Sequence, residues 1–254
     1  MIYTFLGRTG LQVSRICLGT MNFGEHIDEP VSFQIMVEAL EKGINFFDTA
    51  NVYGKNRGKG ETETIIGNWI PQGNRRDKII LSTKVYARMG EGPNSMGLSA
   101  YHIVKQCEES LKRIKTDHID LLQLHHVDRN TPLEETFQAI EQLVKEGKVL
   151  YFGSSNFAGW HIALAQTIAE KRNILGLVSE QSVYHLNNSH VEMEVIPACR
   201  ELGLGFLPWG PLASGLLTGV LNKSFSTGKR SQDRIKSWSV SFRPQLKRYE
   251  NLCN

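Results

Sequence analysis

Short apolar runs alternate with longer segments of helical period along this chain. Runs rich in β-branched and large apolar residues predict seven strands, at Ile16–Thr20, Ile44–Thr49, Ile79–Val85, Ile119–His125, Val149–Ser154, Leu177–Gln181 and Gly205–Trp209. Amphipathic helices are predicted between them. Regular strand–helix alternation is typical of successive right-handed βαβ units, and therefore of a parallel sheet.

Two helices are defined clearly by their apolar stripes. The helix at Ala100–Lys115 has Ile103, Val104, Cys107, Leu111 and Ile114 on one face. The helix at Leu133–Glu146 has Phe137, Ile140, Leu143 and Val144 on one face. Thr131-Pro132-Leu133-Glu134 predicts a capping box at the start of this second helix. Before the first parallel strand, Tyr3–Leu6 and Leu11–Ser14 predict a hairpin that closes the bottom of a barrel.

Two architectures fit this alternation. A doubly wound sheet requires a glycine-rich phosphate turn after its first strand, but Met21-Asn22-Phe23-Gly24 follows here. We therefore predict one α/β domain over residues 1–254, a (β/α)8 TIM barrel with an N-terminal β-hairpin. Only seven strands are counted, so we expect the last strand and helix to be missing and an edge to stay open between strands 7 and 1.

Composition narrows the class of protein. Hydrophobic residues make up 41% and charged residues 22%, as in ordinary soluble domains, and we expect no transmembrane helix and no secretory leader. The four cysteines have no metal or redox spacing, so reduced thiols in the cytoplasm are expected. No metal site is predicted.

The charge is distributed unevenly along the chain. Residues 221–254 carry 8 Lys and Arg against 2 Asp and Glu, whereas the preceding residues are slightly acidic. The basic segment is either a solvated loop or a surface that faces an anionic ligand. The body's charge argues against nucleic-acid binding, and no membrane partner is expected.

Polar side chains gather at the carboxyl ends of the predicted strands, where barrel active sites form. These residues are Asp48, Tyr53 just beyond its strand, Lys84 and His125. A lysine ammonium stabilises a phenolate and lowers the pKa of tyrosine, and a carboxylate neutralises a buried lysine. With a histidine to orient a carbonyl oxygen, the set predicts a device that delivers a proton to a carbonyl attacked by hydride.

Each residue also has an ordinary structural interpretation. Asp48 fits a turn or helix cap, Tyr53 a half-buried loop aromatic, and one of His125 and His126 a core histidine. Lys84 also fits a Schiff-base aldolase, although Tyr53 and Asp48 then have no clear role. Convergence of several strand ends on one face of the barrel favours the proton-delivery hypothesis.

Motifs along most of the chain identify a family. They include Leu6-Gly7-Arg8-Thr9-Gly10, Leu18-Gly19-Thr20-Met21, Gly43-Ile44-Asn45-Phe46-Phe47-Asp48-Thr49-Ala50, Ser82-Thr83-Lys84, Gly153-Ser154-Ser155-Asn156, Glu180-Gln181 and Trp209-Gly210-Pro211-Leu212. With these motifs the chain resembles the aldo-keto reductases, which reduce carbonyls with NADPH on a (β/α)8 barrel.

The resemblance implies a role for each residue. Tyr53 is the general acid, Asp48 and Lys84 tune it, and His125 positions the carbonyl. The implied NADPH site comprises Gly19, Thr20, Met21, Asp48, Ser155, Asn156, Gln181, Trp209, Gly210, Pro211, Leu212, Ala213, Ser214, Gly215, Lys223 and Arg230. The residues implied around the substrate entrance are Met21, Asn22, Phe23, Tyr86, His126 and Trp209.

The implied activity is hydride transfer from NADPH, with NADH as a further option, to an aldehyde or ketone, including sugar-derived ketones. The partner is a small carbonyl compound, and the sequence does not indicate an oligomer. The alternative is a regulatory or cofactor-sensing subunit on the same fold, like the potassium-channel β subunits of this family.

Overall fold

The computed structural model describes residues 1–55 and 59–218. The described residues fall into two compact units. The first consists of Met1–Ser182 and Glu192–Leu207 and contains most of the regular structure. The second consists of Val183–Val191 and the described residues from Pro208 onward.

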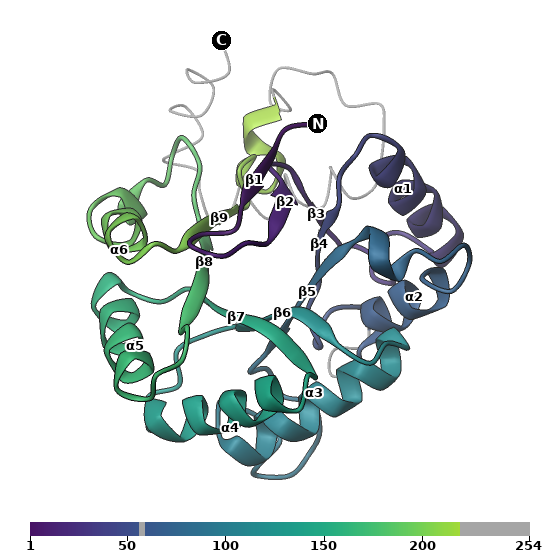
Figure 1. Ribbon diagram of the computed structural model, residues 1–254. Helices are drawn as coiled ribbons and strands as arrows, with labels where there is room; N and C mark the ends of the chain where they lie inside the picture. The colour runs from purple at the N-terminus through teal and green to yellow at the C-terminus, as the bar shows by residue number, and fades with distance from the viewer. Residues whose placement is uncertain (56–58, 219–254) are drawn as a thin grey trace. The chain divides into compact units, whose positions relative to one another are not determined.

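Parallel strands form the inner layer of the first unit. The strands are β3 (Cys17–Gly19), β4 (Phe46–Asp48), β5 (Ile80–Val85), β6 (Ile119–Leu124), β7 (Val149–Ser155), β8 (Leu177–Val183) and β9 (Gly205–Trp209). They neighbour one another in chain order in a sheet of 7 strands, and the pairs from β3 to β8 are parallel. The curled sheet confirms the predicted α/β barrel-type fold and all seven predicted strands (Figure 1).

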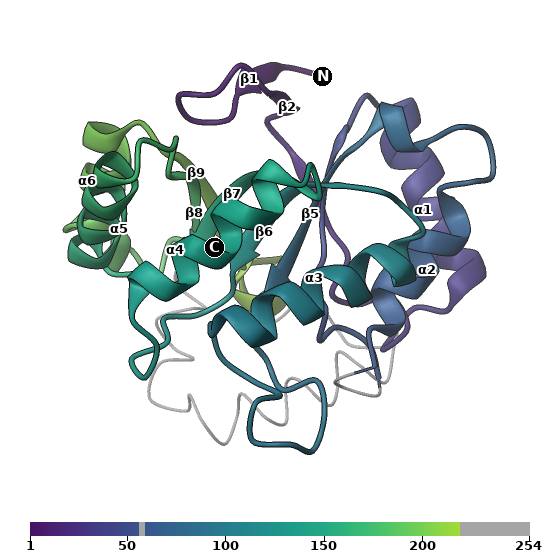
Figure 2. The same ribbon diagram turned by 60° about the horizontal axis from the view of Figure 1, so that its bottom comes forward.

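Helices cover the outer face of this curled sheet, as Figures 1 and 2 show. They are α1 (Glu29–Glu41), α2 (Glu61–Trp69), α3 (Ala100–Ile114), α4 (Leu133–Lys145), α5 (Gly159–Lys171) and α6 (Val195–Leu202). In the predicted stripe of α3, Ile103, Cys107 and Ile114 are buried, whereas Val104 and Leu111 are half-buried. In α4, Phe137, Ile140 and Leu143 are buried, but Val144 is exposed, so the stripe is one residue narrower than predicted.

The capping box predicted at the start of α4 is wrong. Pro132 is the N-cap residue, and no side chain caps the helix. The hydroxyl of Thr131 instead donates to Asp128 Oδ2 at 2.9 Å. Asp128 also accepts the backbone N–H of Leu98 at 2.8 Å and that of Asn130 at 2.9 Å. The helix begins one residue later than the capping box requires, so Thr131 does not occupy the N-cap position, and Asp128 connects its loop to the one before α3.

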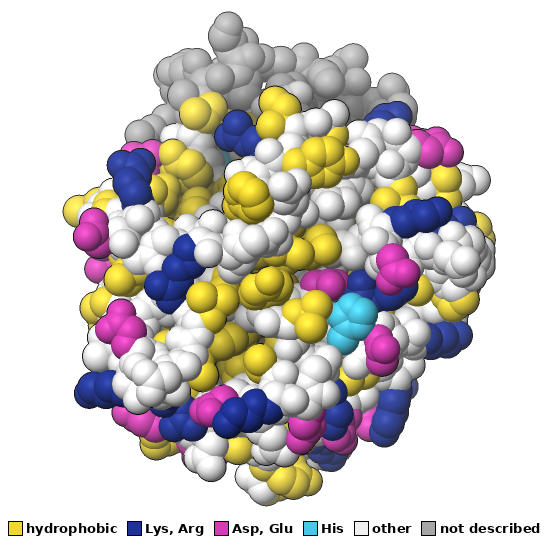
Figure 3. Space-filling model, viewed as in Figure 1, with side chains coloured by type: hydrophobic (Ala, Val, Ile, Leu, Met, Phe, Trp, Pro, Cys, Tyr) yellow, Lys and Arg dark blue, Asp and Glu magenta, His cyan; other side chains and the backbone are white. Residues whose placement is uncertain are grey.

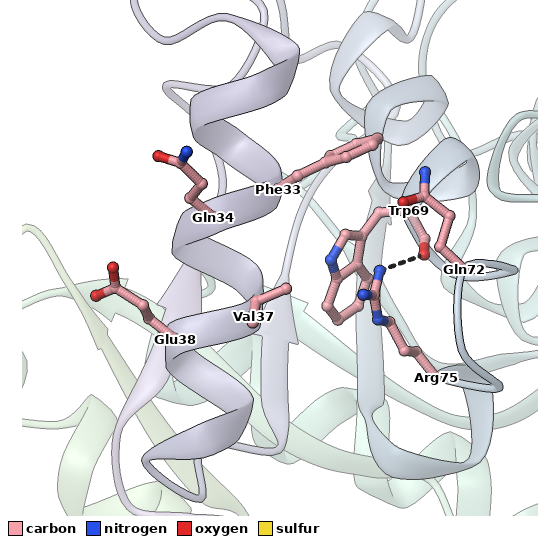
Figure 4. A pocket seen from close by; sticks show the side chains of 7 residues that line it. All are labelled: Phe33, Gln34, Val37, Glu38, Trp69, Gln72 and Arg75. Atoms are coloured by element: carbon pink, nitrogen blue, oxygen red, sulfur yellow. Dashed lines mark hydrogen bonds between the residues drawn. The ribbon is translucent and has the colours of Figure 1, made fainter.

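Large aromatic side chains pack between α1, α2 and the sheet. Trp69 at the end of α2 is fully buried and stacks on Phe47 of β4, with ring centroids 5.7 Å apart. The guanidinium of Arg75 lies 4.5 Å from the Trp69 ring centroid, and its Nη1 donates to the Trp69 carbonyl at 2.9 Å (Figure 4). Phe33 and Val37 of α1 line the same hollow. This packing fixes α1 and α2 outside β4, the strand that carries Asp48.

A hairpin closes one end of the curled sheet. Strands β1 (Tyr3–Phe5) and β2 (Gln12–Ser14) pair antiparallel and lie across the sheet end, as Figure 2 shows. The Arg8 backbone N–H donates to the Gly203 carbonyl at 2.8 Å, just before β9. Ser14 N–H donates to Asn45 Oδ1 at 2.7 Å, just before β4. The hairpin therefore covers the amino ends of the strands, as predicted, and leaves the carboxyl ends for chemistry.

The hairpin has two different sides. Its inner residues Leu6 and Val13 pack with Phe46, Leu121 and Val178 of the sheet. Figure 3 shows apolar side chains over the middle of the opposite, outward face. The exposed apolar residues of this segment are Met1, Ile2, Tyr3 and Phe5.

No helix in the part of the chain that the structure describes is both long and apolar enough to cross a lipid bilayer.

Gly7 provides a test of whether the β1–β2 hairpin packs against the amino ends of the strands, an arrangement called the hairpin plug here. Its φ is +56°, and a Cβ atom there would lie 2.6 Å from the carbonyl oxygens of Val178 and Gly203. We expect Gly7→Ala to lower the free energy of unfolding by about 2 kcal/mol or more, because a left-handed alanine must also displace backbone. The matched control is Gly10→Ala, where a Cβ meets nothing within 4 Å. Equal urea midpoints for the two variants would contradict the plug.

Candidate active site

A buried ion pair lies at the centre of the candidate site. Lys84 of β5 donates to Asp48 Oδ2 of β4 at 2.5 Å, and to the Thr49 carbonyl at 2.8 Å. The Lys84 side chain is 0% exposed. Burial lowers the pKa of Lys84, but Asp48 and Tyr53 together raise it above its usual value. Lys84 is therefore a fixed ammonium, and its nitrogen has no lone pair for a Schiff base.

Two amides hold the other oxygen of Asp48. Gln123 Nε2 of β6 donates to Asp48 Oδ1 at 2.9 Å and to Ser82 Oγ at 2.6 Å. Gln181 Nε2 of β8 donates to the same Asp48 oxygen at 3.2 Å. Strands β4, β5, β6 and β8 thus meet at one carboxylate inside the sheet. Its hydrogen bonds fix the position of the negative charge.

Tyr53 lies beside this ion pair, in the segment after β4. Lys84 Nζ is 5.2 Å from the centroid of its ring and forms a side-chain hydrogen bond with it. Burial raises the pKa of Tyr53, Lys84 lowers it, Asp48 raises it, and the net direction is upward. The lowering of the pKa expected from lysine is present, but burial has the larger effect on Tyr53. The phenol stays protonated at neutral pH, as a proton donor must.

His125 completes the cluster from the end of β6. Its ring meets that of Tyr53 edge to face, with centroids 5.9 Å apart, and stacks on His126 at 5.1 Å. Burial, together with the charges of Lys84 and His126, lowers the pKa of His125 to about 3. Its buried Nδ1 has no hydrogen-bond partner among the described residues. His125 is therefore neutral, and it can orient an oxygen without carrying charge.

A second cluster of polar side chains lies at the ends of β7 and β8. Ser155 Oγ donates to the Gln181 carbonyl at 2.9 Å, and Asn156 Nδ2 donates to Ser155 Oγ at 3.0 Å. Gln181 connects this cluster to Asp48, as described above. Two amides and a hydroxyl offer both donors and acceptors, which is the chemistry that a planar carboxamide requires. The residues predicted to hold the nicotinamide thus fit that group.

The other predicted cofactor residues of the first unit surround β3. Thr20 is buried, and its hydroxyl donates to the Asp48 carbonyl at 2.9 Å. Gly19 and Met21 are exposed beside it. Phe23 does not line an entrance, contrary to expectation, because it is 2% exposed and packs with Met36 and Ile65 in the core. Tyr86 and His126 lie together, with ring centroids 5.4 Å apart.

The second unit carries the remaining predicted cofactor residues. Trp209 is 45% exposed, and its carbonyl accepts the Tyr184 N–H at 3.2 Å. The segment after it, with Pro211 and Leu212, turns tightly through residues of positive φ, namely Gly210, Ala213, Ser214 and Gly215. Such a concentration of left-handed backbone is common at ligand sites. Lys223 and Arg230 lie outside the described residues.

Sequence reasoning assigned no role to two buried polar residues of this region. Gln123 holds Asp48, and its only signal was a polar side chain among the apolar residues of its strand. Glu180 of β8 lies behind the Ser155–Asn156 turn and accepts the Phe157 N–H at 3.1 Å. No cluster of His, Cys, Asp and Glu in the described part of the chain has the arrangement of a metal site.

The carboxyl end of the curled parallel sheet holds a protonated tyrosine, a lysine ammonium and a neutral histidine. This fold and this site are those of an α/β-barrel protein with an enzyme-like site. Residues 15–254 match the model of the aldo/keto reductase family, and the chain belongs to this family of oxidoreductases.

Several relatives resemble the whole chain. An uncharacterized oxidoreductase, YrpG, of Bacillus subtilis is 54% identical over 100% of this chain and 78% of its own length. A probable voltage-gated potassium channel subunit beta of Arabidopsis thaliana is 37% identical over 100% of this chain and 73% of its own length. A putative subunit of the same kind from Schizosaccharomyces pombe is 36% identical over 90% and 67%.

The low pKa of His125 predicts an acid-dependent loss of stability. In the unfolded chain a histidine takes up a proton near pH 6.5, whereas folded His125 does so only at about pH 3. Its neutral burial therefore favours folding above pH 6.5, and this contribution disappears as pH falls toward 3. We expect a loss of at most about 2 kcal/mol at pH 5.

His125→Asn removes the titrating ring and should flatten this part of the curve. Urea unfolding of both proteins from pH 7.5 to 4.5 measures the difference. Parallel curves for the two proteins would contradict the burial of a neutral imidazole at this position.

Proposed function

We propose that this protein transfers a hydride from NADPH to the carbonyl of an aldehyde or ketone, sugar-derived ketones included, with Tyr53 as the general acid. The observation that carries the proposal is the contact of the Tyr53 ring with both Lys84 and His125. A protonated phenol lies beside a fixed ammonium and a neutral imidazole, so three groups that favour a developing alkoxide meet at one place.

The residues have separate tasks in this reaction. Tyr53 Oη gives its proton to the carbonyl oxygen as negative charge develops there. Lys84 then stabilises the resulting phenolate, since its ammonium is held by Asp48 at 2.5 Å. His125 orients the carbonyl oxygen and, being neutral, does not repel Lys84.

Cofactor binding is assigned to two groups of residues. A reduced nicotinamide supplies the hydride when bound. Ser155, Asn156 and Gln181 hold its carboxamide in this proposal, with Gly19, Thr20 and Met21 beside them. Gln181 has a second task, because its amide also orients Asp48. The segment from Trp209 to Gly215 is assigned to the ring and the pyrophosphate.

A second candidate is a regulatory subunit that senses the cofactor without turnover. The potassium channel β subunits among the relatives favour it, at 36–37% identity. The two candidates share the binding residues and differ in one measurable property, which is steady-state oxidation of NADPH by a carbonyl compound.

Replacing the phenol tests the general acid. We expect Tyr53→Phe to reduce kcat for aldehydes and ketones by about 10²–10⁴-fold, because only the proton donor is lost, with little change in NADPH affinity. Tyr101→Phe on the exposed face of α3 is the matched control and should keep wild-type rates. A Tyr53→Phe enzyme of wild-type rate excludes this acid, and NADPH binding without turnover in the wild type favours the regulatory candidate.

The basic segment beyond residue 220 is proposed to face the cofactor's phosphates. We expect a Lys223→Ala, Arg230→Ala, Arg234→Ala variant to bind NADPH about tenfold or more weakly, since charge-assisted phosphate bonds are strong. Salt should weaken binding by the wild type more than binding by the variant. Fluorescence titrations at two ionic strengths measure both effects, and unchanged affinity would make the segment a plain surface loop.

A further inference from the structure

Glu180 is a buried carboxyl group that the proposed reaction does not use. It lies on β8 and is 0% exposed. Its Oε2 accepts the hydroxyl of Ser154 at 2.5 Å, and its Oε1 accepts the hydroxyl of Ser182 at 2.6 Å. Oε1 also accepts the backbone N–H of Phe157 at 3.1 Å. Three donors from β7, β8 and the turn after β7 therefore converge on one side chain.

Glu180 and its neighbour Gln181 point to opposite faces of β8. Gln181 reaches Asp48 inside the sheet, so Glu180 lies on the outer face, next to the helices. The thiol of Cys199 in α6 lies close enough to Glu180 for the carboxylate charge to help raise the pKa of the thiol. Burial raises the pKa of that thiol to about 12, so it stays neutral. Glu180 therefore contacts the candidate site only through the backbone after β7, from the outer face of the sheet, and does not reach a substrate.

The turn that Glu180 binds contains a residue of left-handed backbone and a buried backbone donor. Asn156 has a φ of +60°, a conformation that costs free energy for a residue with a side chain. Phe157 is buried, so its backbone N–H needs an acceptor within the protein. Glu180 supplies the missing acceptor.

This turn carries two of the residues assigned to the nicotinamide. Asn156 Nδ2 donates to the His125 carbonyl at 3.2 Å, and the Asn156 backbone N–H donates to the Gln181 carbonyl at 3.0 Å. A shift of Phe157 would therefore move Asn156 relative to both strands. The ends of β6, β7 and β8 depend on the same turn.

We propose that Glu180 is a positioning residue that fixes the turn Ser155–Phe157, through the Phe157 N–H, so that Ser155 and Asn156 meet the nicotinamide carboxamide. The inference rests on the proposed cofactor site and adds to it a residue on the opposite face of the sheet. What matters is the reach of the side chain, because both forms of the carboxyl group can accept the Phe157 N–H.

The effect of the length of the Glu180 side chain can be measured separately from the effect of its charge. Burial raises the pKa of Glu180 to about 7, against the lowering effect of its hydrogen bonds, so both forms are present at neutral pH. When the carboxyl is protonated, a serine hydroxyl can rotate and accept a hydrogen bond from the carboxyl O–H. The other carboxyl oxygen still accepts the Phe157 N–H. A glutamine keeps the same reach: its amide oxygen can accept the Phe157 N–H while its amide nitrogen donates to a serine hydroxyl that has rotated, whereas aspartate is one methylene too short.

The test compares Glu180→Gln with Glu180→Asp in the full chain. We expect Glu180→Asp to raise the Kd and KM for NADPH about tenfold and to change kcat much less. Glu180→Gln should stay within about twofold of wild type. Ser182→Ala is the matched control, since it removes a partner of Glu180 but leaves the Phe157 bond. Titration by protein fluorescence and steady-state kinetics give these values.

Amide hydrogen exchange gives a readout that does not need the cofactor. In Glu180→Asp, peptides covering 155–160 should exchange about tenfold faster, while those of Ala100–Ile114 in α3 stay unchanged. Equal exchange in the two Glu180 variants, or faster exchange in Glu180→Gln than in Glu180→Asp, would overturn the inference. If wild type binds no NADPH, the proposed function fails, and the exchange data still decide whether Glu180 holds the turn.

Discussion

The buried ion pair between Lys84 and Asp48 is the interaction on which the rest of the site depends. Two charges without water are costly unless every remaining polar atom is satisfied, and removing one partner of such a pair typically costs about 3–5 kcal/mol. Thr49, Gln123 and Gln181 supply the additional hydrogen bonds. They come from different strands, so the register of the sheet and the position of the ammonium are fixed together.

The electrostatics of Tyr53 follow from this pair. Burial alone makes the phenol a weaker acid, and Asp48 adds to the effect, whereas Lys84 opposes both. Before the reaction the proton therefore stays on Tyr53 Oη. In the proposed reaction the ammonium is already in place when the proton leaves, and it needs no reorganisation. The charge of Lys84 also helps to keep His125 neutral, because a second cation beside the ammonium would be repelled.

The sequence predicted the fold well because strand runs and strand ends are local features. All seven parallel strands lie within two residues of their predicted bounds, and Asp48, Lys84 and His125 converge as strand ends in a barrel must. The cap at Thr131 was mispredicted, because the local pattern does not show that Pro132 is the N-cap residue and that the Thr131 hydroxyl binds Asp128. The side on which Phe23 packs likewise depends on α1 and α2, which the local pattern does not place.

Gln123 and Glu180 show where sequence reasoning ends. A polar residue in an apolar strand signals a buried hydrogen bond, but its partner is set by the neighbouring strand's register. The β7–β8 pairing shifts register between Phe152 and Ser154, and only after this shift does Ser154 lie opposite Glu180 and Ser155 opposite Gln181. Consecutive residues of β8 then serve one turn from both faces of the sheet. Gln181 connects it to the ion pair inside, and Glu180 holds its backbone outside, so the geometry of Asn156 depends on the register of β8.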